Sequence, residues 1–398
     1  MFLLILTALL ITMQTAALVP SSTVIIGINA ALQKRFILAP KARLEPGNVH
    51  RSERVEIGVG GKGQDVAVAM SCLGDCNQDG EDRVILTQFI GVGAEGETVL
   101  SALKQRHLSD ALTIRNSAPL RTCTTIVSDD CATELVENSG KISNKEMDDL
   151  FARVEDLTKD GKAGCLCIMG SMPPGCGEET YSELTKRLID GNSLVLIDSV
   201  VGLNPLLETL GNIYSKEAKG AAVLKLNAAE LCKLANVPKK ESERVTLEEL
   251  KESTSNFVNS FNANGLDYLC VTDGKFPGYL IELADEKRTW QMDSIDLSDR
   301  GTLYPIGAGD TVAAGTLAAW QYLHSNNGVI SGTTGANLLE KEALWSKSKS
   351  GRGIQMAAAF AFGIACGSAS CLKEENSVFD VIDAEMFLEG MSEPSLME

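Results

Sequence analysis

Six short apolar segments, each ending in a turn or polar residue, recur along this chain of 398 residues. Their length and composition are typical of strands that are buried on both faces. Segments with helical periodicity separate most of them, for instance at 178–190 and 246–263. This alternation predicts an α/β fold with a mostly parallel central sheet and helices on both of its faces. The expected strands are VIIGI at 24–28, VILTQFIG at 84–91, AGCLCIMG at 163–170, LVLIDS at 194–199, AAVLKLN at 221–227 and YLCVTDG at 268–274.

Three stretches interrupt the alternation of strands and helices. Residues 34–57 and 119–136 alternate with a period nearer two and contain turn residues, which predicts a small separate β-sheet. Residues 325–353 are rich in Ser, Gly and Lys, so most of this stretch is expected to be an exposed insertion between two helices. The remainder, residues 21–398, is expected to form one large domain.

The first 20 residues, MFLLILTALLITMQTAALVP, resemble a targeting segment because an apolar run is followed by small residues. The apolar run is too short for a stable membrane span. The segment also resembles the bipartite leaders of plastid proteins, so we expect a plastid location, with the cytoplasm as the alternative. No Lys or Arg precedes the apolar run, and a strand follows closely, so a docked segment or a wrongly assigned start is the other interpretation.

Charge and cysteine content exclude some classes of function. The formal net charge of -17 disfavours binding to nucleic acid or to an anionic membrane, so any anionic ligand must be met by a local cluster of cations. The chain has eleven cysteines, three histidines and no CxxC pair, which argues against a zinc site. Cys165 and Cys167 share one face of an apolar strand, as buried reduced thiols do.

Two glycine-rich segments match the pattern GxGxxG, namely GVGGKG at 58–63 and GVGAEG at 91–96. The second is not followed by the acidic residue that a dinucleotide fold needs on the next strand, and in the first Lys62 is not followed by Ser or Thr as in a phosphate-binding P-loop. A ligand can nevertheless approach Gly60 and Gly61 closely, and Lys62 adds a charge. A tight turn before a core helix is the alternative interpretation.

The segment YPIGAGDTVAAG at 304–315 places three small residues before an apolar helix. The backbone amides of Gly307, Ala308 and Gly309 would converge at the N-terminus of that helix and form a site for an anion. Asp310 at its mouth is either a helix cap or a base that faces a hydroxyl attacking a phosphoryl group.

Together these segments resemble the PfkB, or ribokinase-like, family of sugar kinases. GGKGQDVAVAMSCLG resembles the first signature of the family and IGAGDTVAAG its second, and GINAAL, PGNVHR, QFIGVGAEGE, LRTCTTIV, MGSMPPG, KLNAAEL, VTDGKFPG and AFAFGIACGSAS match in order. The resemblance covers nearly the whole chain. It implies a ribokinase-like fold in which the small sheet is a lid, and a reaction that uses ATP and Mg²⁺.

The resemblance also assigns roles to individual residues. Asp310 would be the catalytic base, and Gly307, Ala308 and Gly309 would hold the charge developing on the γ-phosphoryl group. Asn227 and Glu230 match the NxxE motif, which positions magnesium through water. The implied substrate contacts are Gln33, Arg51, Gly60, Gly61, Lys62, Asp65, Arg121 and Glu137, and the implied nucleotide contacts are Lys225, Asn227, Glu230, Thr272, Gly274, Gly278 and Gly309.

The substrate class follows from charge. Arg51, Lys62 and Arg121 are expected to face the substrate, and cations of this kind suit a sugar phosphate, with fructose 1-phosphate as the first expectation. The family commonly has Asn at the position of Asp65 and Asp at that of Gln33, so a carboxylate has moved between two sugar-contacting positions. A free-sugar or nucleoside kinase and a catalytically silent scaffold remain alternatives. A homodimer through the lid is also expected.

Overall fold

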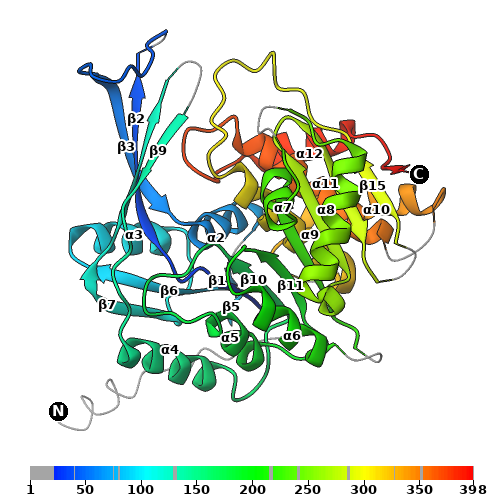
Figure 1. The fold of residues 1–398 in the computed structure, drawn as a ribbon, viewed down its shortest axis with the longest axis horizontal. Coiled ribbons are helices and arrows are strands. Elements are labelled where there is room, and N and C mark those ends of the chain that lie inside the picture. Colours follow the sequence, from blue (N-terminus) through cyan, green and yellow to red (C-terminus); the bar gives the residue numbers. More distant parts are fainter. Residues whose placement is uncertain are drawn as a thin grey trace, which may run out of the picture.

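A ten-stranded sheet lies at the centre of the molecule (Figure 1). The computed structural model describes residues 22–39, 41–74, 76–78, 81–128, 132–214, 218–239, 243–284, 287–326, 328–349 and 353–397. In spatial order the strands are β7 (Thr113–Pro119), β6 (Val84–Val92), β1 (Thr23–Ile26), β10 (Cys165–Met169), β11 (Leu194–Asp198), β12 (Ala221–Asn227), β13 (Tyr268–Asp273), β14 (Phe276–Glu282), β15 (Thr289–Met292) and β16 (Ser395–Met397). The seven strands from β7 to β13 are parallel, and the last three pair antiparallel. All six strands expected from the sequence are present, and the mostly parallel sheet is confirmed.

Helices cover both faces of this sheet, which explains why its strands read as continuous apolar runs. In β1, Ile25 packs into one hydrophobic core while Val24 and Ile26 pack into the other. Cys165 and Cys167 share the face of Ile25, as the sequence predicts, and the cysteines in the described part of the chain are free thiols. The first face carries α2 (Lys62–Leu73), α3 (Ala94–Gln105), α9 (Ala308–Ser325), α10 (Gly332–Ser346), α11 (Gly353–Ser370) and α12 (Val381–Gly390), and the second carries α4 (Asn144–Leu157), α5 (Thr180–Leu188), α6 (Leu203–Ile213), α7 (Ala228–Leu234) and α8 (Leu247–Phe261).

Helix α11 is long and apolar enough to cross a membrane, but its position in the fold gives another reason for its composition. It packs against α9 and α12 in the first core, and 83% of its apolar window is buried inside the protein. Its composition is therefore that of a core helix. The short strands β4 (Asn77–Gln78) and β5 (Glu81–Asp82), which pair with each other, and the 3₁₀ turn η1 (Ala263–Gly265) complete the described elements.

A second sheet of four strands projects away from the central sheet (Figure 1). Its strands lie in the order β3 (Ser52–Gly60), β2 (Ala31–Leu38), β8 (Thr122–Val127) and β9 (Ala132–Val136). β2 and β8 are parallel, and the two outer pairs are antiparallel. The small separate sheet expected from the sequence is therefore present; we call it the lid sheet.

The expectation of an exposed insertion at 325–353 is wrong for most of that stretch. Residues 332–346 form helix α10, and Thr334, Leu338 and Trp345 bury one side of it against the first core. These three residues recur at helical spacing, which the surrounding Ser, Gly and Lys residues obscure in the sequence. The targeting segment expected at 1–20 lies outside the described residues.

Candidate active site

A cleft of about 230 Å³ opens where β1, β10, β11 and β12 end. In an open parallel sheet, ligands bind at the carboxyl ends of the strands, because the loops that follow them are free to diverge. The cleft is lined by Gly27, Asn29, Lys62, Gly63, Gln64, Arg121, Met169, Gly170, Ser171, Ser199, Val200, Val201 and Glu230.

The first glycine-rich motif brings the start of α2 into this cleft. A Cβ on Gly27 would lie 2.6 Å from the Cα of Gly63, so the backbone after β1 and the first turn of α2 can approach this closely only with glycine at both positions. Gly61, with a φ of 104°, turns the chain from β3 into the helix. Both interpretations of the motif therefore hold, since it is a tight turn before a core helix and also the wall of the cleft that carries Lys62.

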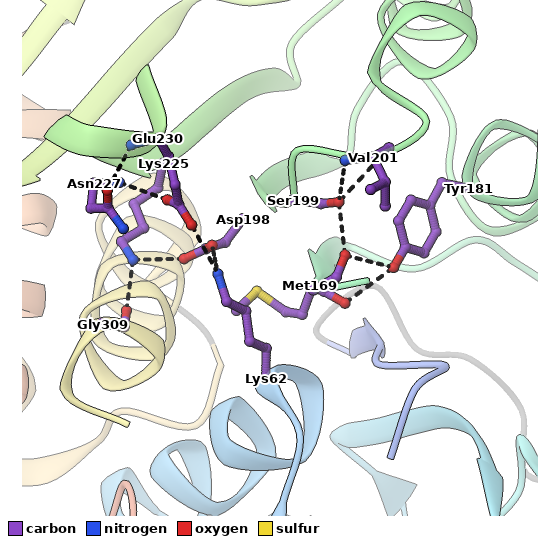
Figure 2. A network of polar contacts seen from close by, with 11 residues as sticks. Lys62, Met169, Tyr181, Asp198, Ser199, Val201, Lys225, Asn227, Glu230 and Gly309 are labelled. Carbon is purple, nitrogen blue, oxygen red and sulfur yellow. Dashed lines mark hydrogen bonds and ion pairs between the residues drawn. The ribbon is translucent and has the colours of Figure 1, made fainter. Parts of the chain in front are cut away.

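Two lysines converge on one buried carboxylate at the base of the cleft (Figure 2). The Nζ of Lys62 lies 2.8 Å from Oδ1 of Asp198, and the Nζ of Lys225 lies 2.6 Å from Oδ2 of the same residue. Burial by itself would raise the pKa of Asp198, but Lys225 and Lys62 outweigh it and hold that pKa below its ordinary value. For Lys62, burial would lower the pKa, whereas Asp198, Asp310 and Glu230 raise it. Lys62 is therefore a firmly charged cation at the wall of the cleft.

Asp310 lies in the first turn of α9, close to the same charges. Burial raises its pKa from 3.8 to about 7; the lysines Lys62 and Lys225 oppose this, and the negative charge of Asp198 adds to it. A carboxylate with a pKa near neutrality can both hold and release a proton at physiological pH, which a general base requires. Of the two roles that the sequence left open, the base is favoured, because Asp310 lies in the interior of the first turn and the residue at the N-cap position is Gly307.

The N-terminus of α9 differs in part from the expected anion site. Gly307 takes the N-cap position with a φ of 81°, in the left-handed region that glycine adopts readily. The amide of Ala308 donates to the carbonyl of Pro305 at 3.2 Å, so it already has a partner within the turn. Gly309 is exposed, and its carbonyl accepts a hydrogen bond from Lys225 at 2.9 Å. The expected contribution of the Ala308 amide to an anion hole is therefore not supported.

Asn227 and Glu230 form the capping box at the start of α7. The amide of Glu230 donates to Oδ1 of Asn227 at 2.8 Å, and the amide of Asn227 donates to Oε2 of Glu230 at 2.9 Å. The remaining oxygen of Glu230 lies 3.6 Å from Nζ of Lys62 at the cleft. Among the described residues, no group of three or more His, Cys, Asp or Glu side chains is arranged to hold a metal ion directly. This donor set fits Mg²⁺ that keeps its waters, as the sequence analysis expects, and does not fit a metal bound only by protein.

Gln33 on the inner face of the lid sheet and Asp65 in the first turn of α2 are both buried. Gln33 on β2 is buried and donates from Nε2 to the Thr125 hydroxyl on β8 at 2.7 Å, and it packs against Gly60. Asp65 on α2 is 6% exposed, and its Oδ1 has no hydrogen-bond partner. Burial raises its pKa well above the ordinary value, the nearby charge of Asp310 raises it further, and Arg35 on β2 lowers it. The carboxylate of Asp65, at a position where the family commonly has Asn, therefore lies under the lid sheet and near Asp310.

Of the two arginines expected at the substrate, only Arg121 lines the cleft. It donates from Nη2 to the carbonyl of Asn29 at 2.8 Å and from Nε to the carbonyl of Ala30 at 3.3 Å. Arg51 is exposed and precedes β3, whose other end, Gly60, is followed two residues later by Lys62 at the cleft. At ~3.3 Å per residue, Arg51 lies about 30 Å from Gly60 along the strand, so its expected place at the cleft of its own chain is wrong.

Glu137 is exposed at the base of the lid sheet and does not line the cleft. Its Oε2 accepts a hydrogen bond from the amide of Thr122 at 2.9 Å, which fixes the end of the β8–β9 pair. The contact is a structural one within the lid sheet, so the structure gives no support for a direct contact between Glu137 and the substrate.

The expected nucleotide residues continue along the same edge of the sheet. Thr272 at the end of β13 pairs with Asn227 at the end of β12, and Gly274 follows with a φ of 60°. Gly278 on β14 packs against α11, because a Cβ there would meet Ile364 at 2.9 Å. Thr272 and Gly274 are thus placed one strand away from Asn227, whereas Gly278 has a packing role.

The sequence analysis did not identify Asp198 or Asn29 as site residues. Asp198 ends the apolar strand β11, and a lone carboxylate at that point of a parallel strand is a signal that could have been used. Asn29 follows β1 in the same way; it donates from Nδ2 to the Ser171 hydroxyl at 2.8 Å and accepts from the Ser139 hydroxyl at 2.6 Å.

Comparisons with known proteins agree with this geometry. A family profile described as pfkB family carbohydrate kinase matches residues 30–377. Phosphofructokinase-2 from Escherichia coli, solved in complex with potassium, superposes with a TM-score of 0.64 at 19% identity over 92% of this chain and 98% of that one. A possible 1-phosphofructokinase from Thermotoga maritima gives 0.62 at 15% over 95% and 100%, and the ribokinase of that organism gives 0.60 at 15% over 93% and 99%. At these identities the structural neighbours establish the ribokinase-like fold, and the profile establishes the family.

Proposed function

Because this chain belongs to the pfkB family of carbohydrate kinases, we propose that it transfers the γ-phosphoryl group of ATP to a hydroxyl of a sugar phosphate. The observation that carries the proposal is that Lys62 and Arg121 line the cleft while Lys225 and Asp310 lie beside Lys62, on a chain whose formal net charge is -17. Phosphoryl transfer needs an aligned nucleophile and cations that neutralise the transferred group.

In the proposed reaction, Asp310 takes the proton of the acceptor hydroxyl while that oxygen forms a bond to the γ-phosphorus. The bond between the γ-phosphorus and the bridging oxygen breaks, and ADP leaves with the bonding electrons. Lys62 and Lys225 offset the negative charge on the transferred group. Magnesium, positioned by Asn227 and Glu230 through water, would supply further neutralisation of the phosphates.

The choice of a sugar phosphate depends on the cations at the cleft. Arg121 and Lys62 line it and can meet a second phosphate, whereas a free sugar is bound mainly by carboxylates and amides. Because Arg51 lies away from the cleft, it adds no positive charge there. The proposed binding of a second phosphate therefore depends on Arg121. Fructose 1-phosphate is our first candidate, and fructose 6-phosphate follows, because the structural neighbours include a possible 1-phosphofructokinase and phosphofructokinase-2.

We also propose that the outer face of the lid sheet binds a second copy of this chain. Strand pairing aligns Ile57, Lys34, Thr124 and Leu135 in one row and Val55, Phe36, Ile126 and Thr133 in the next. Ile57 and Leu135 are each 57% exposed, an unusual amount of apolar surface for one face of a small sheet, whereas Gln33 and Arg35 on the other face are buried. The phosphofructokinase-2 of Escherichia coli has an inhibited form that is tetrameric.

A screen of ATP consumption with purified protein and Mg²⁺ tests the proposed reaction. The panel is fructose 1-phosphate, fructose 6-phosphate, tagatose 6-phosphate, fructose, ribose and adenosine, with Asp310→Asn as the matched inactive control. We expect turnover with at least one of the three phosphosugars and much less with the others. Turnover with ribose or adenosine alone would contradict the phosphosugar assignment, and no turnover across the panel would favour the scaffold alternative.

A further inference from the structure

Asp198 has no role in the sequence motifs or in the reaction steps proposed above, yet it lies between Lys62 and Lys225 and contacts both (Figure 2). It is the last residue of β11, and its side chain is 1% exposed. Each of its carboxylate oxygens is bound by a different lysine, Oδ1 by Lys62 at 2.8 Å and Oδ2 by Lys225 at 2.6 Å. A single buried carboxylate therefore fixes two cations that come from opposite sides of the site, from the start of α2 and the end of β12.

The second contact of each lysine directs it toward the reacting groups. Lys225 also donates to the carbonyl of Gly309, the residue before Asp310, at 2.9 Å. Lys62 is 40% exposed and lines the cleft, with Glu230 at 3.6 Å. The single carboxylate of Asp198 thus holds two ammonium groups, and Lys62 is the one that an anion in the cleft can reach.

We propose that Asp198 is a positioning residue, which holds Lys62 and Lys225 together as a paired cation site for the γ-phosphoryl group next to Asp310. The inference rests on the proposed function. Two ammonium groups on flexible side chains repel each other and have many rotamers, so without the shared carboxylate they would not remain at one point. Lys225 is 5% exposed, so without Asp198 its ammonium group would be left buried with the carbonyl of Gly309 as its remaining hydrogen-bond partner.

The test compares the binding of two nucleotides by calorimetry, Mg-ADP and the non-hydrolysable analogue Mg-AMP-PNP, which differ in the γ-phosphoryl group. Wild-type protein is expected to prefer the analogue. Asp198→Asn keeps the shape of the side chain, and we expect it to lose at least about tenfold of this preference while Mg-ADP still binds. If Asp198 served only to stabilise the fold, Asp198→Asn would not selectively weaken the binding of the nucleotide that carries the γ-phosphoryl group.

Glu282→Gln is the matched control. Glu282 is also a buried carboxylate, 3% exposed, and it is held by Arg288 at 3.2 Å and by the indole of Trp290 at 2.8 Å. It pairs with Tyr268 at the start of β13, which places it at the opposite edge of the sheet from the cleft. We expect this variant to keep the wild-type preference.

A second variant covers the case in which Asp198→Asn does not fold. Lys62→Met changes a half-buried side chain, and it should reduce the preference for Mg-AMP-PNP in the same direction. If the preference in folded Asp198→Asn, or in Lys62→Met, equals or exceeds that of wild type, the positioning role is wrong while the proposed kinase function stands. If wild-type protein binds neither nucleotide, the proposed function is wrong, and the role of Asp198 fails with it.

Discussion

Asp310 is the residue whose chemistry depends most on its surroundings. Its carboxyl group gains proton affinity from burial and from Asp198, and it loses some to Lys62 and Lys225, with a resulting pKa of about 7. Glu230 on α7 adds negative charge, and Asp65 on α2 faces it from under the lid sheet. The balance of these groups brings the pKa of the base close to neutrality.

We therefore predict that kcat/KM for the phosphosugar falls as the pH drops below about 7. A base must be ionised to act, so well below its pKa the rate should fall about tenfold per pH unit. A pH–rate profile between pH 5.5 and 8.5 measures this limb. A flat profile over that range would contradict the pKa assigned to Asp310, or its role as the base.

Asp65 gives a prediction about stability. Its pKa in the folded protein is raised well above 3.8, chiefly by burial, so the folded state holds this proton more firmly than the unfolded state does. Stability contributed in this way is present at low pH and is lost as the pH rises through the folded pKa. Asp65→Asn removes the ionisable group, so the variant should gain free energy of unfolding relative to wild type as the pH rises from 5 to 8.

Thermal or urea unfolding at several pH values measures this difference. The gain should be of the order of 1–3 kcal/mol at pH 8, the typical cost of a buried polar group without a partner. Asp149→Asn, at an exposed position on α4, is the control and should show no such trend. If Asp65→Asn and wild type change in parallel with pH, the carboxylate is not buried in the way described here.

Single residues also show where sequence reasoning succeeds and where it fails. Asp310 and Lys62 could be assigned because short local motifs place them at the start of helices. Arg51 could not, because its distance from the cleft depends on the length and direction of β3, which no local motif encodes. Asp198 was not identified because its role depends on contacts with Lys62 and Lys225. These residues are distant from it in the sequence, so no local motif indicates the contacts.

At the scale of elements, the turn that begins α9 determines where Asp310 lies. Gly307 has a φ of 81°, and a Cβ at this position would lie 2.5 Å from the hydroxyl of Ser377. That hydroxyl donates to the carbonyl of Gly307 at 3.1 Å, which ties the turn to the segment after α11. The position of the helix start therefore depends on a residue without a side chain.

Gly307→Ala is accordingly expected to lower the free energy of unfolding by about 1–3 kcal/mol. Alanine is strained in the left-handed region, and its Cβ would clash with the hydroxyl of Ser377. The substitution should also lower kcat, because Asp310 would move with the turn. Gly301→Ala is the control for the backbone term alone, since Gly301 has a φ of 77° and open space around it. Equal losses of stability in the two variants would show that the contact with Ser377 has no effect.

The strands and helices with clear periodicity were predicted correctly from the sequence, while α10 was not. A buried parallel strand such as β11 contains little besides apolar residues, so its identity is evident locally. In α10, the residues that are buried are few, namely Thr334, Gly335, Leu338 and Trp345, and the abundant polar residues around them gave the composition of a loop. The order of strands in the sheet depends on contacts between distant segments, so the sequence predicts the type of sheet but not its order.

At the scale of the whole molecule, the two faces of the lid sheet differ: Gln33 and Arg35 are buried on one face, while Ile57 and Leu135 are exposed on the other. This asymmetry leads to a prediction about assembly. Ile57→Asp combined with Leu135→Asp should convert a dimer to a monomer, because two charges would have to be buried in the interface. Ile382→Asp, at a residue that is 72% exposed on α12, is the control.

Light scattering after size-exclusion chromatography measures the masses of these variants. The wild-type chain and Ile382→Asp should both elute as dimers, and the double variant as a monomer. A monomeric wild-type chain at micromolar concentration, or a double variant that remains a dimer, would show that the outer face of the lid sheet is not the interface.

The most direct test of the whole account is the transfer step in the Asp310→Asn variant. With the best phosphosugar of the panel, phosphorus NMR should show wild-type protein forming ADP and phosphorylated sugar in equal amounts. The variant should bind Mg-AMP-PNP as wild type does and lose at least about a hundredfold in kcat, the usual contribution of a general base. Turnover by Asp310→Asn near the wild-type rate would contradict the assignment of this carboxylate as the base, and with it the mechanism proposed for the cleft.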